Sequence, residues 1–258
     1  MKNAMNAKFF CLIAAGALLA SIGTASAENP ATLTDGQLDK VTAGAANPQI
    51  PVSSATFANG TNGPGWVNPA EGSGPVRSLL EIRQHDVTIQ KWDLSCGAAA
   101  LDTLLRYQFG EPVTEKQIAD ALMRRTEYVE HPQLVQLHEG FSLFDLKHFL
   151  SAYDGGKYKG VGLGQLDLKD LIERAPLIVP VNALGYDHYV VFRGIMGDRV
   201  LLADPAWGNR TMTIDKFQRM WHDYGKPMGH IGFVVESADG RKLPDRMQPK
   251  PSDFVMLR

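Results

Sequence analysis

A cysteine stands directly before a run of helix-forming residues in the stretch QKWDLSCGAAALDTLL, residues 90–105. A thiol in the first turn of a helix lies near backbone N–H groups that lack intrahelical partners, at the positive end of the helix dipole. Such surroundings favour the thiolate, which is the nucleophilic form of cysteine. Cys96 is therefore a candidate for covalent catalysis. A small, inert core residue is the other interpretation of a free cysteine.

A cysteine nucleophile needs a base, and the base needs a group that orients it. His188 begins the apolar run HYVVF, and Asp204 follows sixteen residues later in LLADP. If these runs pair as an antiparallel hairpin, the imidazole and the carboxylate lie close together on neighbouring strands. Taken singly, His188 is an ordinary strand-end histidine and Asp204 a turn residue before Pro205. Taken together with Cys96, they predict a Cys-His-Asp triad.

Acyl transfer also needs a hydrogen-bond donor aimed at the oxyanion of the tetrahedral intermediate. Gln90 lies six residues before Cys96, on the loop that enters the helix. Its side-chain amide can reach a point beside the backbone N–H of the nucleophile. Alone, Gln90 would be a surface glutamine. With the triad it completes a predicted catalytic site of four residues.

The first 27 residues read as a secretory signal peptide, with two lysines, an apolar run and the small residues Ala25-Ser26-Ala27. An uncleaved membrane anchor is the alternative. Cleavage after Ala27 would remove Cys11 and leave Cys96 as the only cysteine, so no disulfide can form within the mature chain. We expect an exported protein, periplasmic in location, whose stability comes from a hydrophobic core.

Charge and histidine patterns exclude several other kinds of function. The 26 basic and 28 acidic residues give a formal net charge of −2, with no basic stripe. Nucleic-acid binding is therefore not expected. His131, His138 and His148 do not have the spacing of a metal site, so we expect neither a metal nor a cofactor.

The sequence divides into four parts by composition. After the signal peptide, residues 28–75 contain a leader-like segment and a linker rich in Gly, Pro, Asn and Ser. A packed domain is expected over residues 76–236. Residues 237–258 form a tail rich in proline and charge.

Within the domain, periodicity predicts helices first and strands afterwards. Helical patterns are followed by β-branched and alternating runs that predict an antiparallel sheet, which together indicate an α+β fold. The expected helices cover residues 96–110, 113–125, 141–156, 166–175 and 215–225, and the expected strands lie within 176–184, 188–205, 210–214 and 230–237.

Three motifs in this order resemble the C39 peptidases of the papain-like superfamily. They are Gln-x5-Cys-Gly at the start of a helix, His-Tyr-Val-Val, and Asp-Pro followed by Gly, within residues 85–235. This family includes the bacteriocin-processing domains that remove double-glycine leaders. The resemblance implies a papain-like fold in which N-terminal helices pack on a C-terminal antiparallel sheet. It also implies Cys96 as nucleophile, His188 as base and acid, Asp204 as orienter and Gln90 in the oxyanion hole. The sequence departs from the family at Ala98, where proline is common.

Bacteriocin exporters carry this domain on a transmembrane ATPase, whereas this sequence has no G-x-x-x-x-G-K-[ST] motif. We therefore expect a stand-alone exported peptidase that cuts polypeptides without ATP. Similar proteins accompany bacterial functional-amyloid secretion systems. Two alternatives stay open, namely another Cys-His-Asp acyl-transfer enzyme, such as a cell-wall amidase or a transglutaminase-like protein, and a non-catalytic peptide-binding domain.

The stretch LTDGQLDKVTAG, residues 33–44, resembles the family's own substrate signal. Leu33, Leu38 and Val41 have the spacing of the apolar anchors in double-glycine leaders. Ala43-Gly44 stands where the paired small residues stand. We hypothesise that this segment is a propeptide cut after Gly44, or that it docks in the cleft and holds the enzyme inactive. A short amphipathic helix without such a role is the alternative.

Overall fold

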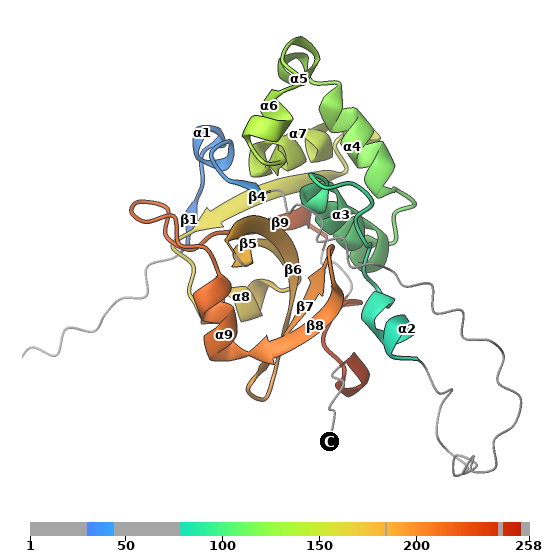
Figure 1. The fold of residues 1–258 in the computed structure, drawn as a ribbon, viewed down its shortest axis with the longest axis vertical. Coiled ribbons are helices and arrows are strands. Elements are labelled where there is room, and N and C mark those ends of the chain that lie inside the picture. The colour runs from blue at the N-terminus through green and yellow to red at the C-terminus, as the bar shows by residue number, and fades with distance from the viewer. Residues whose placement is uncertain (1–29, 44–77, 184, 242–244, 254–258) are drawn as a thin grey trace, which may run out of the picture.

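The computed structural model describes residues 30–43, 78–183, 185–241 and 245–253. The expected signal peptide and the linker part of the expected 28–75 segment lie outside these residues. In the described part, an antiparallel sheet of seven strands is the centre of the molecule (Figure 1). In spatial order its strands are β1 (Ala31–Thr32), β4 (Tyr158–Gly164), β9 (Gly232–Ser237), β5 (Leu177–Ala183), β6 (Tyr186–Met196), β7 (Arg199–Asp204) and β8 (Gly208–Thr213).

Helices cover both faces of this sheet. The first layer contains α3, α4 and α7, and it packs on β4 and β6, while α8 and α9 lie against the opposite face (Figure 1). The helices are α1 (Asp35–Leu38), α2 (Leu79–Gln84), α3 (Cys96–Thr103), α4 (Glu115–Met123), α5 (Thr126–Glu130), α6 (Leu134–Leu137), α7 (Leu143–Ala152), α8 (Leu168–Arg174) and α9 (Ile214–Met220). A π-helical turn, Leu104–Phe109, extends α3, and short 3₁₀ turns cover Tyr153–Gly155 and Pro251–Asp253.

Alternation along the central strands explains why they read as solidly apolar runs. Side chains of successive strand residues point to opposite faces. Tyr189 and Val191 of β6 belong to the core under α3 and α7, whereas Val190 and Phe192 belong to the core under α8 and α9. A strand buried on both faces needs apolar residues at every position.

The α+β class expected from the sequence is confirmed, with helices packed on an antiparallel sheet. Helix α4 begins with a capping box, in which the Thr114 hydroxyl accepts from the Gln117 N–H and the Gln117 side chain accepts from the Thr114 N–H. Ser142 caps α7 in the same way. The hairpin between β6 and β7 turns at Gly197-Asp198, since Met196 pairs with Arg199.

Residues 30–43 pack onto the domain as an extended segment with one helical turn. Strand β1 pairs with β4 and forms one edge of the seven-stranded sheet, and β2 (Thr42–Ala43) pairs with β3 (Phe141–Ser142) in a second, two-stranded sheet. Between them, α1 lies beside the α6–α7 layer (Figure 1). The segment therefore contributes to the core as well as to both sheets.

Part of the C-terminal region also packs on the domain. Met247 is buried, and its carbonyl accepts a hydrogen bond from the buried Arg193 guanidinium at 3.0 Å. The same guanidinium pairs with Asp253 at 3.2 Å. Among the described residues, no helix is long and apolar enough to span a bilayer.

Candidate active site

The nucleophile candidate begins helix α3 and is completely buried. Cys96 has 0% exposure, and its sulfur lies 3.1 Å from the carbonyl oxygen of Ala43, to which the thiol donates. Ser95 precedes the helix without a side-chain cap bond to its first turn. The first-turn N–H groups beside the sulfur therefore have no side-chain cap among the described residues.

His188 and Asp204 meet as expected from the hairpin. Nε2 of the imidazole lies 2.8 Å from Oδ1 of the carboxylate, and both side chains are 1% exposed. The other ring nitrogen, Nδ1, has no hydrogen-bond partner among the described residues. Because Nε2 donates to Asp204 in the neutral ring, Nδ1 is the nitrogen left to accept a proton from a thiol.

Asp204 is held from three directions, which fixes its carboxylate. Oδ1 also accepts from the Ala206 N–H at 2.9 Å, and Oδ2 accepts from the Arg210 guanidinium at 3.0 Å. Burial opposes the charged form of Asp204. The partners His188, Arg210 and Ala206 outweigh it and lower the pKa of this carboxyl below its usual value. The carboxylate is thus ionised and rigid.

The pKa of His188 shifts in the opposite direction. Burial disfavours the charged imidazolium, but the hydrogen bond to Asp204 and the interaction with Cys96 outweigh burial and raise the pKa to about 10. An imidazole with that pKa binds a proton readily at neutral pH. The pair is therefore suited to hold the proton that leaves the thiol.

Gln90 lies where the loop before α3 meets the Asp-Pro turn. Its backbone N–H donates to the Pro205 carbonyl at 2.9 Å. Its side-chain nitrogen donates to the carbonyls of Trp92 and Asp93 at 3.0 and 3.3 Å, and its side-chain oxygen is buried without a partner in the described part of the chain. To donate to an oxyanion, the Gln90 amide must break one of these two hydrogen bonds. The bond to the Asp93 carbonyl is the longer and weaker of the two.

Glu115 anchors the same loop, and sequence reasoning missed it. One carboxylate oxygen accepts from the Lys91 N–H at 2.9 Å and contacts the Ser95 hydroxyl at 2.6 Å. The backbone N–H of Glu115 donates to Asp102 of α3 at 2.9 Å. Burial raises the pKa of Glu115. Glu115 is the first residue of α4, where acidic residues are common, so no sequence signal marked it.

Two further residues near Cys96 were not predicted. The Tyr189 hydroxyl donates to the Val41 carbonyl. Gly140 has φ of 131° and lies against the Ala43 carbonyl so closely that a Cβ there would collide with it. Only glycine is tolerated at Gly140, for both reasons. The run HYVVF predicted that Tyr189 lies in a strand, but nothing in the sequence predicted its hydrogen bond to Val41.

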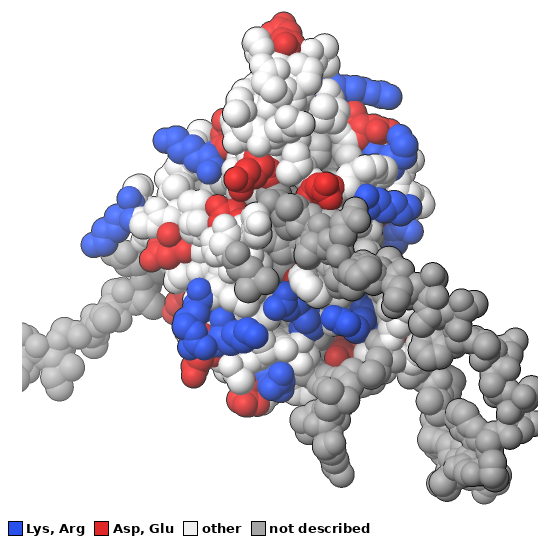
Figure 2. Space-filling view, viewed as in Figure 1, with Lys and Arg blue, Asp and Glu red and all other residues white. Residues whose placement is uncertain are grey.

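Positively charged residues gather near Arg210, the ion-pair partner of Asp204. A hollow of about 460 Å³ is lined by Arg83, Trp207, Arg210 and Lys216, among others. Lys and Arg side chains cluster on this part of the surface, over α9 and the end of the sheet (Figure 2). His131, His138 and His148 lie apart on or after helices α5, α6 and α7. No group of metal-binding side chains occurs within the described ranges.

Comparison with known proteins identifies the family of this chain. Residues 84–225 match the sequence model of the peptidase C39 family, and this match covers more than half of the chain. The chain belongs to that family. It is a C39 cysteine peptidase, and the resemblance inferred from the three motifs is confirmed.

Two relatives of this C39 peptidase carry the same name. The probable functional amyloid protease FapD of Pseudomonas aeruginosa is 32% identical over 68% of this chain and 72% of its own length. The probable functional amyloid protease FapD of Pseudomonas fluorescens is 33% identical, over 57% of this chain and 62% of its own length.

Solved structures of C39 domains are also similar. A double glycine motif protease from an AMS/PCAT transporter, in complex with the leader peptide, aligns with a TM-score of 0.43 and 21% identity, over 59% of this chain and 91% of that one. The peptidase domain of Streptococcus ComA, a bifunctional ABC transporter, aligns with a TM-score of 0.43 and 16% identity, over 58% and 96%.

Proposed function

We propose that this C39 peptidase is an exported cysteine endopeptidase that cuts polypeptides after small residues, at sites of double-glycine type. Cys96 would be the nucleophile, His188 the base and acid, Asp204 the orienting group and Gln90 an oxyanion donor. The observation that carries the proposal is the buried His188–Asp204 hydrogen bond at 2.8 Å, which leaves Nδ1 unpartnered in the described structure.

The proposed reaction begins with proton transfer from the Cys96 thiol to Nδ1 of His188. The thiolate then attacks the carbonyl carbon of the scissile bond, and the imidazolium gives its proton to the leaving amine. Asp204 keeps the imidazole oriented and stabilises its positive charge, as the raised pKa of His188 reflects. Water then hydrolyses the thioester with His188 as base, which restores the thiol.

The oxyanion that forms during attack needs donors that are already in position. The backbone N–H of Cys96 lies in the first turn of α3, where the intrahelical ladder does not use it. The Gln90 amide is the second donor. The loop that carries it is fixed by Glu115 at one end and by Pro205 at the other. This anchoring supports a preorganised hole.

The walls of the cleft support a preference for small residues. A Cβ on Gly140 would strike the carbonyl of Ala43, the residue that contacts the Cys96 sulfur. Chain that lies next to Cys96 therefore passes close against the Gly140 backbone, which leaves little room for large side chains on that side.

Two observations support the proposed setting. The first 27 residues have the pattern of a secretory signal, which implies export across the inner membrane to the periplasm. The relatives are probable functional amyloid proteases, which supports a secreted or amyloid-forming polypeptide as substrate.

Terminal proteomics of the exported proteins tests this proposal. We expect new N-termini preceded by small residues in cells that express the wild type, and their loss with Cys96→Ala. Ser151→Ala, on the exposed side of α7, is the control and should leave the cuts in place. Equal sets of N-termini from the wild type and Cys96→Ala would refute the proposal.

A further inference from the structure

The N-terminal segment, residues 30–43, covers the nucleophile. The Ala43 carbonyl receives the hydrogen bond of the Cys96 thiol at 3.1 Å, and both residues are completely buried. Nδ1 of His188 has no hydrogen-bond partner among the described residues. The thiol is therefore bound to the segment and not to the base. The carbonyl of another polypeptide cannot take this place while Ala43 holds it.

Strand β4 leaves space for two leucines of the segment. A Cβ on Gly162 would lie 2.1 Å from the Leu38 side chain, and a Cβ on Gly164 would lie 2.7 Å from the Leu33 side chain. Neither glycine has a positive φ, so backbone conformation does not require glycine at either position. Because alternate residues of a strand share one face, both spaces lie on the same side of β4. The strand is thus shaped for a peptide with two bulky apolar side chains at this spacing.

Backbone hydrogen bonds hold the segment at both of its ends. The Leu33 N–H donates to the Gly162 carbonyl at 2.8 Å. Near the other end, the Val41 carbonyl accepts from the Leu143 N–H at 3.0 Å and from the Tyr189 hydroxyl. Strand β2 then pairs with β3. This is the mode in which a protein binds an extended peptide by strand addition, with side-chain pockets that give specificity.

Tyr189 connects this binding mode to the proposed catalytic residues. It directly follows His188 on β6, and its buried ring packs so closely against Gly97 that a Cβ there would lie 3.2 Å from it. Gly97 in turn follows Cys96 at the start of α3. The residue that holds the Val41 carbonyl therefore adjoins both the base and the nucleophile. The segment binds at the proposed site of catalysis and not on a distant face.

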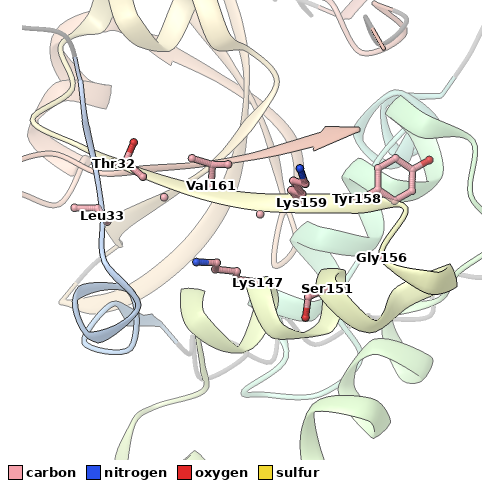
Figure 3. Close-up of a pocket in the computed structure, with 10 residues that line it drawn as sticks. Thr32, Leu33, Lys147, Ser151, Gly156, Tyr158, Lys159 and Val161 are labelled. Atoms are coloured by element: carbon pink, nitrogen blue, oxygen red, sulfur yellow. The ribbon is translucent and has the colours of Figure 1, made fainter. Parts of the chain in front are cut away.

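One side of the segment borders an open hollow of about 420 Å³ between α7 and β4. The hollow is lined from the segment by Thr32 and Leu33, and from α7 by Lys147 and Ser151 (Figure 3). Lys147 also forms an ion pair with Asp35 of α1, and both side chains are partly exposed. Solvent therefore reaches the first half of the segment, which the domain does not enclose on this side.

Release of the segment leaves the remaining strand pairs intact. Strand β1 is an edge strand that pairs with β4, and β4 stays paired with β9 on its other side. Strand β2 pairs with β3 in the separate two-stranded sheet. Among the described strands, no other pair depends on β1 or β2. The segment is thus placed like a bound peptide that can leave while the rest of the sheet persists.

We propose that residues 30–43 are an intramolecular inhibitor, which occupies the place of the polypeptide substrate and which the substrate must displace to reach Cys96. This inference rests on the proposed function, since it takes Cys96 as the nucleophile. A thiol that donates to a carbonyl oxygen meets the oxygen and not the carbon, so Ala43 is held without being attacked. The substrate that displaces the segment has apolar side chains where Leu33 and Leu38 lie, and a small residue where Ala43 lies.

Inhibition of this kind changes KM and not kcat. The inhibitor is part of the chain, so its effective concentration is on the order of 1 mM. A free substrate competes with it, which raises the apparent KM. At saturation the segment is displaced and no longer contacts Cys96, so the chemical step is the same with or without it.

Steady-state kinetics test the proposal with a synthetic peptide that has leucines at the spacing of Leu33 and Leu38 and a double-glycine site. Leu38→Asp places a charge in the buried space beside Gly162, so KM should fall by about tenfold or more while kcat stays unchanged. Lys40→Asp is the matched control, because the Lys40 side chain is exposed, and its KM should equal that of the wild type. An unchanged KM in folded Leu38→Asp would overturn the inference.

A charge reversal at the surface decides the question if Leu38→Asp does not fold. Asp35→Lys replaces the ion pair with Lys147 by two like charges. Because an exposed pair contributes little, we expect KM to fall by only about two- to fivefold. Lys147→Asp in the same chain should restore the KM of the wild type. In that event, equal KM values in the wild type, Asp35→Lys and the double variant would overturn the inference.

A synthetic peptide of residues 30–43 shows whether the segment inhibits as a ligand or only supports the fold. The peptide is added at up to about 1 mM, which matches the effective concentration of the tethered segment, to the variant with the lowered KM. It should raise KM for the substrate and leave kcat unchanged. The same peptide with Leu38→Asp should have no effect. Inhibition by neither peptide, or equal inhibition by both, would overturn the inference.

Cys96→Ala versions of each enzyme separate failure of this inference from failure of the proposed function. Cys96-dependent cutting with equal KM in the wild type and the segment variants would refute the inhibition and leave the peptidase function standing. If neither the wild type nor the folded segment variants cut the substrate in a Cys96-dependent way, the proposed function falls, and this inference falls with it.

Discussion

The sulfur of Cys96 lies 3.1 Å from the carbonyl oxygen of Ala43, across a separation of 53 residues in the sequence. This contact joins the first turn of α3 to a strand that the N-terminal segment adds to the domain. The thiol is therefore covered by chain and not by solvent. Access to the nucleophile depends on whether the segment stays in place, and several measurable properties follow from that dependence.

Alkylation of Cys96 should depend on both the segment and His188. With residues 30–43 in place the thiol is inaccessible, so iodoacetamide should react slowly. Leu38→Asp should loosen the segment and raise the rate. In that background, His188→Ala should reduce alkylation at pH 6 by about tenfold or more, because the imidazolium that stabilises the thiolate is gone. Rates are measured by mass spectrometry. Identical pH profiles with and without His188 would show that the two side chains are not coupled.

The His188–Asp204 pair should stabilise the fold over a defined pH window. The folded pKa of His188 is raised to about 10, so its contribution is complete below the unfolded value near ~6.5 and is lost as pH rises toward 10. The folded pKa of Asp204 is lowered, so its contribution is present above ~3.9 and is lost as pH falls.

The difference in unfolding free energy between wild type and Asp204→Asn should thus be largest between about pH 4 and pH 6.5. It should shrink in both acid and alkaline solution. Urea unfolding at pH 3, 5.5 and 9.5 measures it, with Asp198→Asn in the β6–β7 turn as the control. A pH-independent difference would contradict the assigned shifts.

Much of the site followed from the sequence because its members belong to local patterns. Cys96 precedes a helical run, and one hairpin connects His188 to Asp204, so short-range structure brings these two together. The caps at Thr114 and Ser142 are likewise determined within four residues. Contacts that span a few residues or one turn can therefore be predicted from the local sequence pattern.

Strand β4 shows why other parts could not be predicted. Its sequence, YKGVGLG, has glycine at alternate positions, and glycine is depleted in strands because it adds flexibility and no side chain. Gly162 and Gly164 leave the space needed by Leu38 and Leu33, which lie more than 120 residues earlier, and Gly160 leaves space for the Phe233 ring. Glu115 was missed for a similar reason, since its partners Lys91 and Ser95 are on another element.

Loss of the Gln90 amide should affect the chemical step more than binding. Gln90→Ala is expected to lower kcat by about 10²–10³, because an oxyanion donor acts only when charge develops on the carbonyl oxygen. KM for a double-glycine peptide should change little. Steady-state kinetics on the Leu38→Asp background, where the cleft is open, give both values. A rise in KM with unchanged kcat would instead assign Gln90 to the loop structure seen in its bonds to Trp92 and Asp93.

The fit between Gly162 and Leu38 can be measured as a coupling energy. In the Cys96→Ala chain, Leu38→Ala should destabilise the fold by about 2–5 kcal/mol through a cavity, and Gly162→Ala by about 1–3 kcal/mol through overpacking. The double variant should lose about 0.5–3 kcal/mol less unfolding free energy than the two single variants lose together. The reason is that the alanine at position 162 fills space that the shortened residue 38 leaves. Urea unfolding at neutral pH gives each value. Gly164→Ala combined with Leu38→Ala is the matched control, since Gly164 faces Leu33, and strict additivity is expected there. Additivity in the Gly162 cycle as well would mean that the two residues do not share one cavity.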